Sequence, residues 1–221
     1  FYGTKLVCVE SPLISRYDRY RGALKALGLE AGEENAFHPP VIDEASASRV
    51  GRFMKDNCLE KEKYVVLFLG ASRKQAFKRW PLFRFMELAR LIRERTGMKS
   101  VLGWGPDEAE LCSALNKEQH LVVPPMLSLQ ESASMILGAA AFVGADTGLM
   151  HLSALSGVRT VAVMGATSPV LNKPWGERSR IAFREGVRGS CRGEKCDHSA
   201  CMGGISAEDV FARLGELLDG G

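Results

Sequence analysis

The sequence lacks a long uninterrupted apolar segment. Its least polar stretch lies between Glu131 and Arg159, where Asp146 and His151 are the only ionisable side chains and four glycines interrupt the pattern. A transmembrane helix needs about 20 predominantly apolar residues, so this stretch is better explained as a helix, a buried strand, a polar turn and a second helix. The chain also opens without a basic segment followed by an apolar run. We therefore expect no signal peptide and a soluble, cytoplasmic protein.

A strong net charge and a disulfide-rich composition are absent as well. The 221 residues carry 29 Lys and Arg against 26 Asp and Glu, and the resulting charge of +3 gives no reason to expect a nucleic acid partner. Hydrophobic residues make up 46% and charged residues 25%, which excludes a disordered or fibrous chain. A chain of this length buries enough core to fold without disulfides. Three of its six cysteines lie scattered in apolar segments, as structural thiols do, and we therefore expect a reducing cytoplasm.

Familiar catalytic and phosphate-binding signatures are missing too. The sequence contains no GxSxG, no HExxH and no spaced carboxylate pair, and no nucleophile stands beside an evident base. The Walker spacing GxxxxGK[ST] and the dinucleotide fingerprint GxGxxG are also absent. Any phosphate recognition must therefore use another arrangement.

The pattern that is present is a regular alternation of strands and helices. Apolar runs predict strands at 64–69, 100–104, 120–123, 141–145 and 160–164, and 180–183 is a candidate for one more. Helices are expected at about 81–95, 109–116, 128–138, 147–156 and 207–218, the third with Ser128 as N-cap. Unbroken apolar strands that alternate with helices are typical of a parallel sheet covered on both faces. The expected fold class is α/β, with a doubly wound, mostly parallel, Rossmann-like sheet.

The first 45 residues differ from this pattern. A short β-like run at 4–10 and a helix at about 14–27, closed by Gly28, precede a segment at 29–45 that is rich in Gly, Pro and acids. A further helix is expected at about 46–57. We predict that residues 1–45 are the remnant of an N-terminal domain with its linker. Residues 46–221 then form the Rossmann-like domain with its closing helix.

The loops that lead from strands into helices are the expected place for a ligand, because ligands of such sheets bind outside the carboxyl ends of the strands. This rule selects the loops 70–80, 105–108, 146–151 and 165–174. In the third of these loops, a carboxylate ends a buried strand, and Thr147 and Gly148 open a helix whose free N–H groups favour phosphate. Helical spacing brings His151 near the same mouth. The alternative is that Asp146 caps the helix and His151 is a satisfied core histidine.

Two further groups of residues have chemistry to offer. The loop at 70–80 holds four cations and no acid, so it either neutralises phosphates or forms a solvated edge. Cys191, Cys196 and Cys201 recur at intervals of five residues, with His198 among them. That spacing lies at the upper edge of zinc-site spacings. A metal site, a disulfide and free thiols are all open there.

Several of these segments together resemble one family. They occur in the family's order and spacing, and they are Val65–Ser72, Lys78–Pro81, Trp104–Glu108, Phe142–Leu152 and Thr160–Pro169. Over roughly residues 60–175 the sequence resembles the C-terminal half of the ADP-heptose:lipopolysaccharide heptosyltransferases, which are GT-B glycosyltransferases with two Rossmann-like domains. The resemblance implies that this half binds the nucleotide-sugar donor, ADP-heptose.

The resemblance also implies which residues contact the donor. These are Ser72, Lys78, Asp107, Glu108, Met126, Leu127, Asp146, Thr147, Gly148, His151 and Thr167. The residues of the 146–151 loop would lie at the diphosphate and sugar, and Lys78 would neutralise the phosphates. Asp107 or Glu108 would contact the donor's hydroxyls. Met126 or Leu127 would line the adenine pocket.

The same resemblance implies the reaction of the intact enzyme. Heptose would pass with inversion from ADP-heptose to the lipid A-core acceptor of lipopolysaccharide, without a metal or cofactor. The family's presumed base lies in the N-terminal domain, so we expect no catalytic residue in this chain and no turnover by it alone. The basic segment at 173–195 is a candidate for peripheral contact with the inner membrane. Two alternatives are a nucleotide-sugar epimerase domain and a non-catalytic module that binds a nucleotide, a metal or a partner protein.

Overall fold

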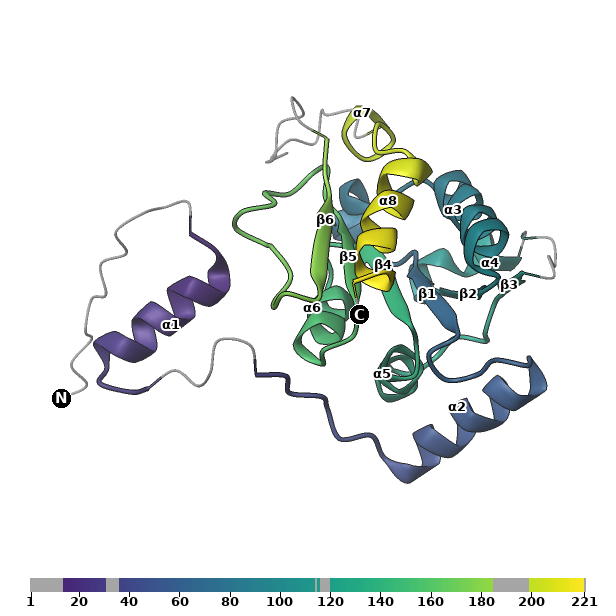
Figure 1. Cartoon of the computed structure of the whole chain (residues 1–221), viewed down its shortest axis with the longest axis horizontal. Helices are drawn as coiled ribbons and strands as arrows, with labels where there is room; N and C mark the ends of the chain where they lie inside the picture. The colour runs from purple at the N-terminus through teal and green to yellow at the C-terminus, as the bar shows by residue number, and fades with distance from the viewer. Residues whose placement is uncertain (1–13, 31–35, 114, 116–119, 185–198, 221) are drawn as a thin grey trace.

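Six parallel strands form the centre of the molecule (Figure 1). The computed structural model of the chain describes residues 14–30, 36–113, 115, 120–184 and 199–220. The strands are β1 (Tyr64–Phe68), β2 (Lys99–Gly103), β3 (Leu121–Val122), β4 (Ala141–Ala145), β5 (Thr160–Val163) and β6 (Ser179–Ala182). They pair in the order β3-β2-β1-β4-β5-β6, and every neighbouring pair is parallel. This is the doubly wound order, with its switch point between β1 and β4. The predicted fold class is confirmed, and so is the strand expected near 180–183.

Helices cover both faces of this sheet. The described helices are α2 (Glu44–Asp56), α3 (Leu82–Thr96), α4 (Ala109–Ser113), α5 (Leu129–Leu137), α6 (Gly148–Leu155), α7 (Ser199–Met202), α8 (Ala207–Leu218) and α1 (Arg16–Ala26). The last of these, α1, buries none of its residues and lies to one side of the sheet (Figure 1). Successive side chains of a strand point to opposite faces. Val65 and Leu67 of β1 therefore join the core beneath α3 and α8, whereas Tyr64 and Val66 join the core beneath α2, α5 and α6. Burial on both faces explains why β1 is apolar throughout.

The predicted helices agree with the structure except around the loops. Ser128 caps α5 as predicted: its hydroxyl accepts the Glu131 N–H at 3.2 Å, and the Glu131 carboxylate accepts the Ser128 N–H at 2.7 Å. The segment predicted as a basic loop instead contains the 3₁₀ helix η1 (Arg73–Lys78), and a second, η2 (Pro106–Glu108), precedes α4. Such short turns leave no amphipathic period in the sequence. The predicted helix to 116 is described only as far as the end of α4.

The first described segment contacts the loop after β5 and the end of α6. In α1, the Ser15 hydroxyl accepts the Asp18 N–H at 3.2 Å, and Gly28 has a φ of +76° just beyond the end of the helix, as its predicted role requires. The Arg16 N–H donates to the Leu171 carbonyl at 3.0 Å. Farther along, the His38 N–H donates to the Leu155 carbonyl at 2.7 Å. The strand predicted at 4–10 lies outside the described residues.

The carboxyl ends of the strands meet at one edge of the sheet, where η1 follows β1, η2 follows β2 and α6 follows β4. None of the helices in the described ranges is long and apolar enough to cross a membrane.

Candidate functional site

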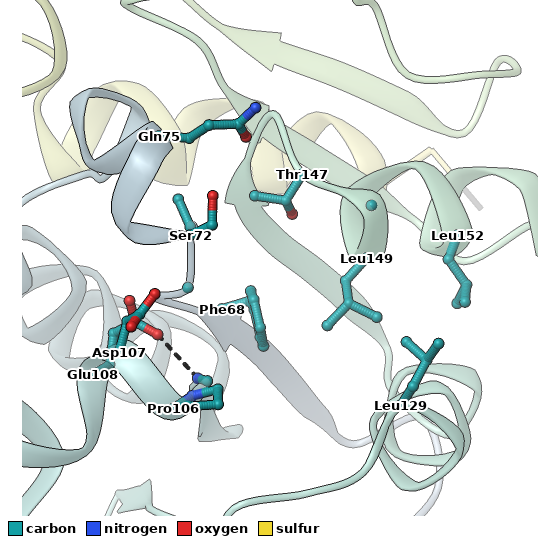
Figure 2. Close-up of a pocket in the computed structure, with 14 residues that line it drawn as sticks. Phe68, Ser72, Gln75, Pro106, Asp107, Glu108, Leu129, Thr147, Leu149 and Leu152 are labelled. Carbon is teal, nitrogen blue, oxygen red and sulfur yellow. Dashed lines mark hydrogen bonds between the residues drawn. The ribbon is translucent and has the colours of Figure 1, made fainter.

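A cavity of about 600 Å³ opens at this edge of the sheet. Figure 2 shows residues from the loops after β1 and β2 on one side of it and residues from α5 and α6 on the other. The labelled residues that line it are Phe68, Ser72, Gln75, Pro106, Asp107, Glu108, Leu129, Thr147, Leu149 and Leu152. One side is therefore largely polar and the other largely apolar. This combination suits a ligand with a flat apolar part and a charged part.

The Phe68 ring, at the end of β1, forms part of the lining, and two glycines make room for it. A Cβ atom built at Gly70 or at Gly103 would lie 2.7 Å from an atom of this ring. That distance is too short for any side chain at either position. The two glycines therefore fix the place of an aromatic surface inside the cavity.

An ion pair joins the two loops of the polar side. Glu108 is only 2% exposed; its Oε2 accepts the Gly105 N–H at 3.0 Å, drawn as a dashed line in Figure 2. Its Oε1 lies 2.5 Å from Nη2 of Arg79. The Arg79 guanidinium also donates two hydrogen bonds to the Ala71 carbonyl, at 3.1 and 2.7 Å. The loops after β1 and β2 are thus tied together by a charge-assisted network.

The N-terminus of α6 is uncapped where it faces the cavity. Thr147 is the N-cap residue, but its side chain makes no capping hydrogen bond. Its Oγ1 atom is buried and lacks a hydrogen-bond partner among the described residues. A buried hydroxyl without a partner is costly. Together with the positive end of the helix dipole, it makes this point of the cavity suited to an anion that accepts hydrogen bonds.

Beside the uncapped end lies a polar cluster of Lys78, Asp146, His151 and Thr167. The Lys78 ammonium donates to Oδ2 of Asp146 at 3.1 Å and to the Asp146 carbonyl at 3.2 Å. Nε2 of His151 lies 3.4 Å from Oδ1 of the same carboxylate. Burial alone would raise the pKa of Asp146, but hydrogen bonds from His151, Lys78 and Thr167 and the charge of Lys78 lower it below its usual value. The cluster therefore holds an ionised carboxylate.

These contacts decide between the two interpretations of Asp146 and His151. Thr147 occupies the N-cap position, so the alternative in which Asp146 caps α6 is wrong. The His151 side chain is 29% exposed, so it is not a core histidine, although both of its ring nitrogens have partners. Both residues belong to a polar cluster next to Thr147, which lines the cavity.

The structure brings most of the predicted donor-site residues together. The cavity is lined by five of them: Ser72, Asp107, Glu108, Thr147 and Gly148. The polar cluster contains four more: Lys78, Asp146, His151 and Thr167. Leu127 lines a smaller cavity that shares Phe68 with the large one, whereas Met126 is 55% exposed and lines neither. Their contact with an adenine ring stays a prediction.

Several lining residues were not found from the sequence. Leu149 and Leu152 were not predicted as site residues, although their i, i+3 spacing puts them on one face of α6. Arg79 was noted only as one of the four cations of its loop, because nothing local to it shows that its partner is Glu108, 29 positions later.

The cysteine cluster is only partly described. Cys201 is a buried free thiol, while Cys191, Cys196 and His198 lie outside the described residues. Within the described part of the chain, no group of three or more His, Cys, Asp or Glu side chains is arranged to hold a metal ion. The choice among a metal site, a disulfide and free thiols at 191–201 stays a prediction.

Comparisons with known proteins show the family and the fold of this chain. The curated lipooligosaccharide heptosyltransferase 2 of Campylobacter jejuni is 29% identical over 166 residues, which are 71% of this chain and 51% of that protein. The solved structure of the glycosyl transferase family 9 from Veillonella parvula has a TM-score of 0.76 at 20% identity, covering 100% of this chain and 64% of that one. For E. coli heptosyltransferase WaaC with ADP, the TM-score is 0.66 at 22% identity, covering 98% of this chain and 60% of that one. These structural likenesses show the fold.

The chain spans about half the length of the curated relatives it matches. The model of glycosyltransferase family 9 (heptosyltransferase) matches residues 25–201, which is well over half of this chain. The chain therefore belongs to glycosyltransferase family 9, the heptosyltransferase family.

Proposed function

We propose that this chain is the donor-binding half of a heptosyltransferase and that it binds ADP-heptose in the cavity at the N-terminus of α6. The observation that carries the proposal is the buried Thr147 hydroxyl, which has no partner within the described ranges and adjoins the uncapped helix end. A diphosphate oxygen would accept hydrogen bonds from both. The E. coli relative with the same fold is described with ADP. Family membership favours this function over the epimerase and the non-catalytic module.

The residues of the site would divide the work of donor binding and leaving-group stabilisation. As the bond to the sugar breaks, negative charge grows on the departing ADP, and Lys78 together with the α6 N-terminus would stabilise it. Asp146 holds the Lys78 ammonium at this place. Of the two predicted acids, Asp107 is the better candidate for the donor hydroxyls, because its side chain is 31% exposed whereas that of Glu108 is enclosed by Arg79 and Gly105. The base of the nucleoside would lie against the apolar side of the cavity.

The rest of the reaction belongs to the proposal as well. Residues 1–45 would be the end of an N-terminal domain and its linker, and 46–221 the donor domain. The base that deprotonates the acceptor hydroxyl would come from the N-terminal domain. The acceptor would be the lipid A-core of lipopolysaccharide, which the intact enzyme would meet peripherally at the cytoplasmic face of the inner membrane.

Calorimetric titration of the chain with ADP, and with UDP as the control, tests the donor site. We expect ADP to bind, Asp146→Ala to abolish that binding and UDP to give no signal. Tighter binding of UDP than of ADP would contradict the ADP-heptose assignment and leave the fold untouched. Failure of both nucleotides to bind would contradict a preformed donor site in this chain.

A further inference from the structure

Tyr17 of α1 contacts the donor site across 134 positions of sequence. Its hydroxyl lies 2.7 Å from Nδ1 of His151 on α6. Its ring packs edge-on to the His151 ring at 5.8 Å between centroids and tilted against the Trp175 ring at 5.1 Å. The hydroxyl is thus held at one nitrogen of His151 by packing on two sides.

The contact continues through His151 to the cation of the site. The second ring nitrogen of His151, Nε2, faces Oδ1 of Asp146 at 3.4 Å, and Oδ2 of Asp146 holds Lys78 at 3.1 Å. Tyr17, His151, Asp146 and Lys78 therefore form one unbroken series of polar contacts. It runs from the first described helix to the N-terminus of α6.

The chemistry of the end groups fixes where the protons lie. An ionised carboxylate only accepts hydrogen bonds, so Nε2 of His151, which faces Asp146, carries a proton. Burial, the Asp146 charge and Tyr20 raise the pKa of Tyr17 to about 12, so its phenol keeps a proton that it can donate to an unprotonated Nδ1. A neutral imidazole has one donor and one acceptor nitrogen. For the neutral ring of His151, the arrangement therefore selects the Nε2–H tautomer.

We propose that Tyr17 is a positioning residue of the donor site: its hydroxyl fixes the tautomer and ring orientation of His151, and through His151 it holds the Asp146 carboxylate that places Lys78. This inference rests on the proposed function, since it concerns the same anion site. It adds α1, which lies outside the Rossmann-like fold, to the parts on which donor binding depends. Donor affinity and the docking of α1 are thereby coupled, because each is favoured when the other is in place.

The test is Tyr17→Phe, which removes the hydroxyl and keeps the ring that packs against Trp175. Tyr20→Phe is the matched control, because Tyr20 is on the same helix and is 64% exposed. Two quantities are measured: the tautomer of His151, from long-range ¹H–¹⁵N correlations of its ring, and the affinity for ADP by calorimetry. In the wild-type chain and in Tyr20→Phe we expect the Nε2–H tautomer and equal affinities. In Tyr17→Phe we expect a mixture of tautomers and an affinity lower by about two- to tenfold, the range of one hydrogen bond.

The outcomes separate this inference from the function on which it rests. If wild-type chain binds ADP and Tyr17→Phe binds it equally well with an unchanged His151 tautomer, the positioning role is overturned and the donor site stands. If Tyr17→Phe loses thermal stability but keeps both the tautomer and the affinity, Tyr17 only supports the docking of α1, and the positioning role is likewise overturned. If the wild-type chain does not bind ADP, the proposed function and this inference fall together.

Discussion

Two neighbouring cations, Lys78 and Arg79, reach two different carboxylates, Asp146 and Glu108, and the two ion pairs have different surroundings. The Arg79–Glu108 pair is closed: the guanidinium also holds the Ala71 carbonyl, and the second carboxylate oxygen of Glu108 is occupied by the Gly105 N–H. The Lys78–Asp146 pair is open, because it adjoins the uncapped end of α6 and the partly exposed His151.

The difference shows how a structural ion pair and a functional one are told apart in one site. The closed pair binds other groups of the protein as well, since Arg79 donates to the Ala71 carbonyl and Glu108 accepts the Gly105 N–H. Its role is therefore to hold the two loops together. The open pair lies next to the Thr147 hydroxyl, which has no hydrogen-bond partner among the described residues, and next to the uncapped N-terminus of α6. Substitutions in the closed pair should therefore change stability, and substitutions in the open pair should change ligand affinity.

The largest effect is expected from Arg79→Ala. This substitution leaves the Glu108 carboxylate buried without its cation, which should lower the free energy of unfolding by about 3 kcal/mol. Urea denaturation followed by circular dichroism measures it. Arg73→Ala is the control, because Arg73 is 88% exposed in its pair with Asp107 and should change stability by less than about 1 kcal/mol. Equal effects of the two substitutions would show that the closed pair is no brace.

The next effect is expected from Lys78→Ala, which should weaken ADP binding by about 2 kcal/mol because a charge-assisted contact to phosphate is lost. In the intact enzyme, kcat should fall as well, because the activation free energy should rise by about 2–4 kcal/mol. Lys74→Ala, at an exposed position of the same η1 helix, is the control for calorimetry and kinetics. An unchanged kcat in Lys78→Ala would contradict the role of Lys78 in stabilising the leaving group.

Thr147→Val tests whether a single atom, the Thr147 hydroxyl oxygen, serves ligand affinity or stability. Valine keeps the branched shape that fits the extended backbone of Thr147 and removes a buried hydroxyl with no partner in the described part of the chain. The free energy of unfolding should stay equal or rise by about 1 kcal/mol, while ADP affinity should fall by about 1 kcal/mol. Denaturation and calorimetry on the same preparation measure both. A loss of stability without a loss of affinity would mean that the hydroxyl serves the fold.

The smallest effect is expected at an ion pair away from the cavity, between Arg49 of α2 and Glu131 of α5. Hydrogen bonds from Arg49 and Ser128 lower the pKa of Glu131 to about 2. A carboxyl whose pKa is lower in the folded state stabilises the fold above its unfolded pKa, near 4.5, and this stabilisation disappears as the pH falls toward 2. The wild-type chain should therefore be more stable than Glu131→Gln at pH 7, by a margin that shrinks at pH 3. A stability difference between the two proteins that is larger at pH 3 than at pH 7 would contradict this prediction.

The sequence predicted the parts of this molecule that depend on local pattern. Strands buried on both faces leave unbroken apolar runs, and Ser128 and Gly28 mark helix ends by their own chemistry, so the fold and the loops at 70–80, 105–108 and 146–151 could be located. Arg79 and Tyr17 escaped because their partners, Glu108 and His151, lie 29 and 134 positions away. Such pairings are set by tertiary packing between segments far apart in the sequence, which no local period encodes.

The most direct measurement is a crystal structure of the chain with ADP. The account predicts that a diphosphate oxygen lies within hydrogen-bond distance of the Thr147 hydroxyl and the first N–H groups of α6. It also predicts that the Lys78 ammonium contacts the phosphates and that the Arg79–Glu108 pair is unchanged. ADP bound elsewhere on the chain, or phosphates held by Arg79 with the Glu108 pair broken, would contradict it.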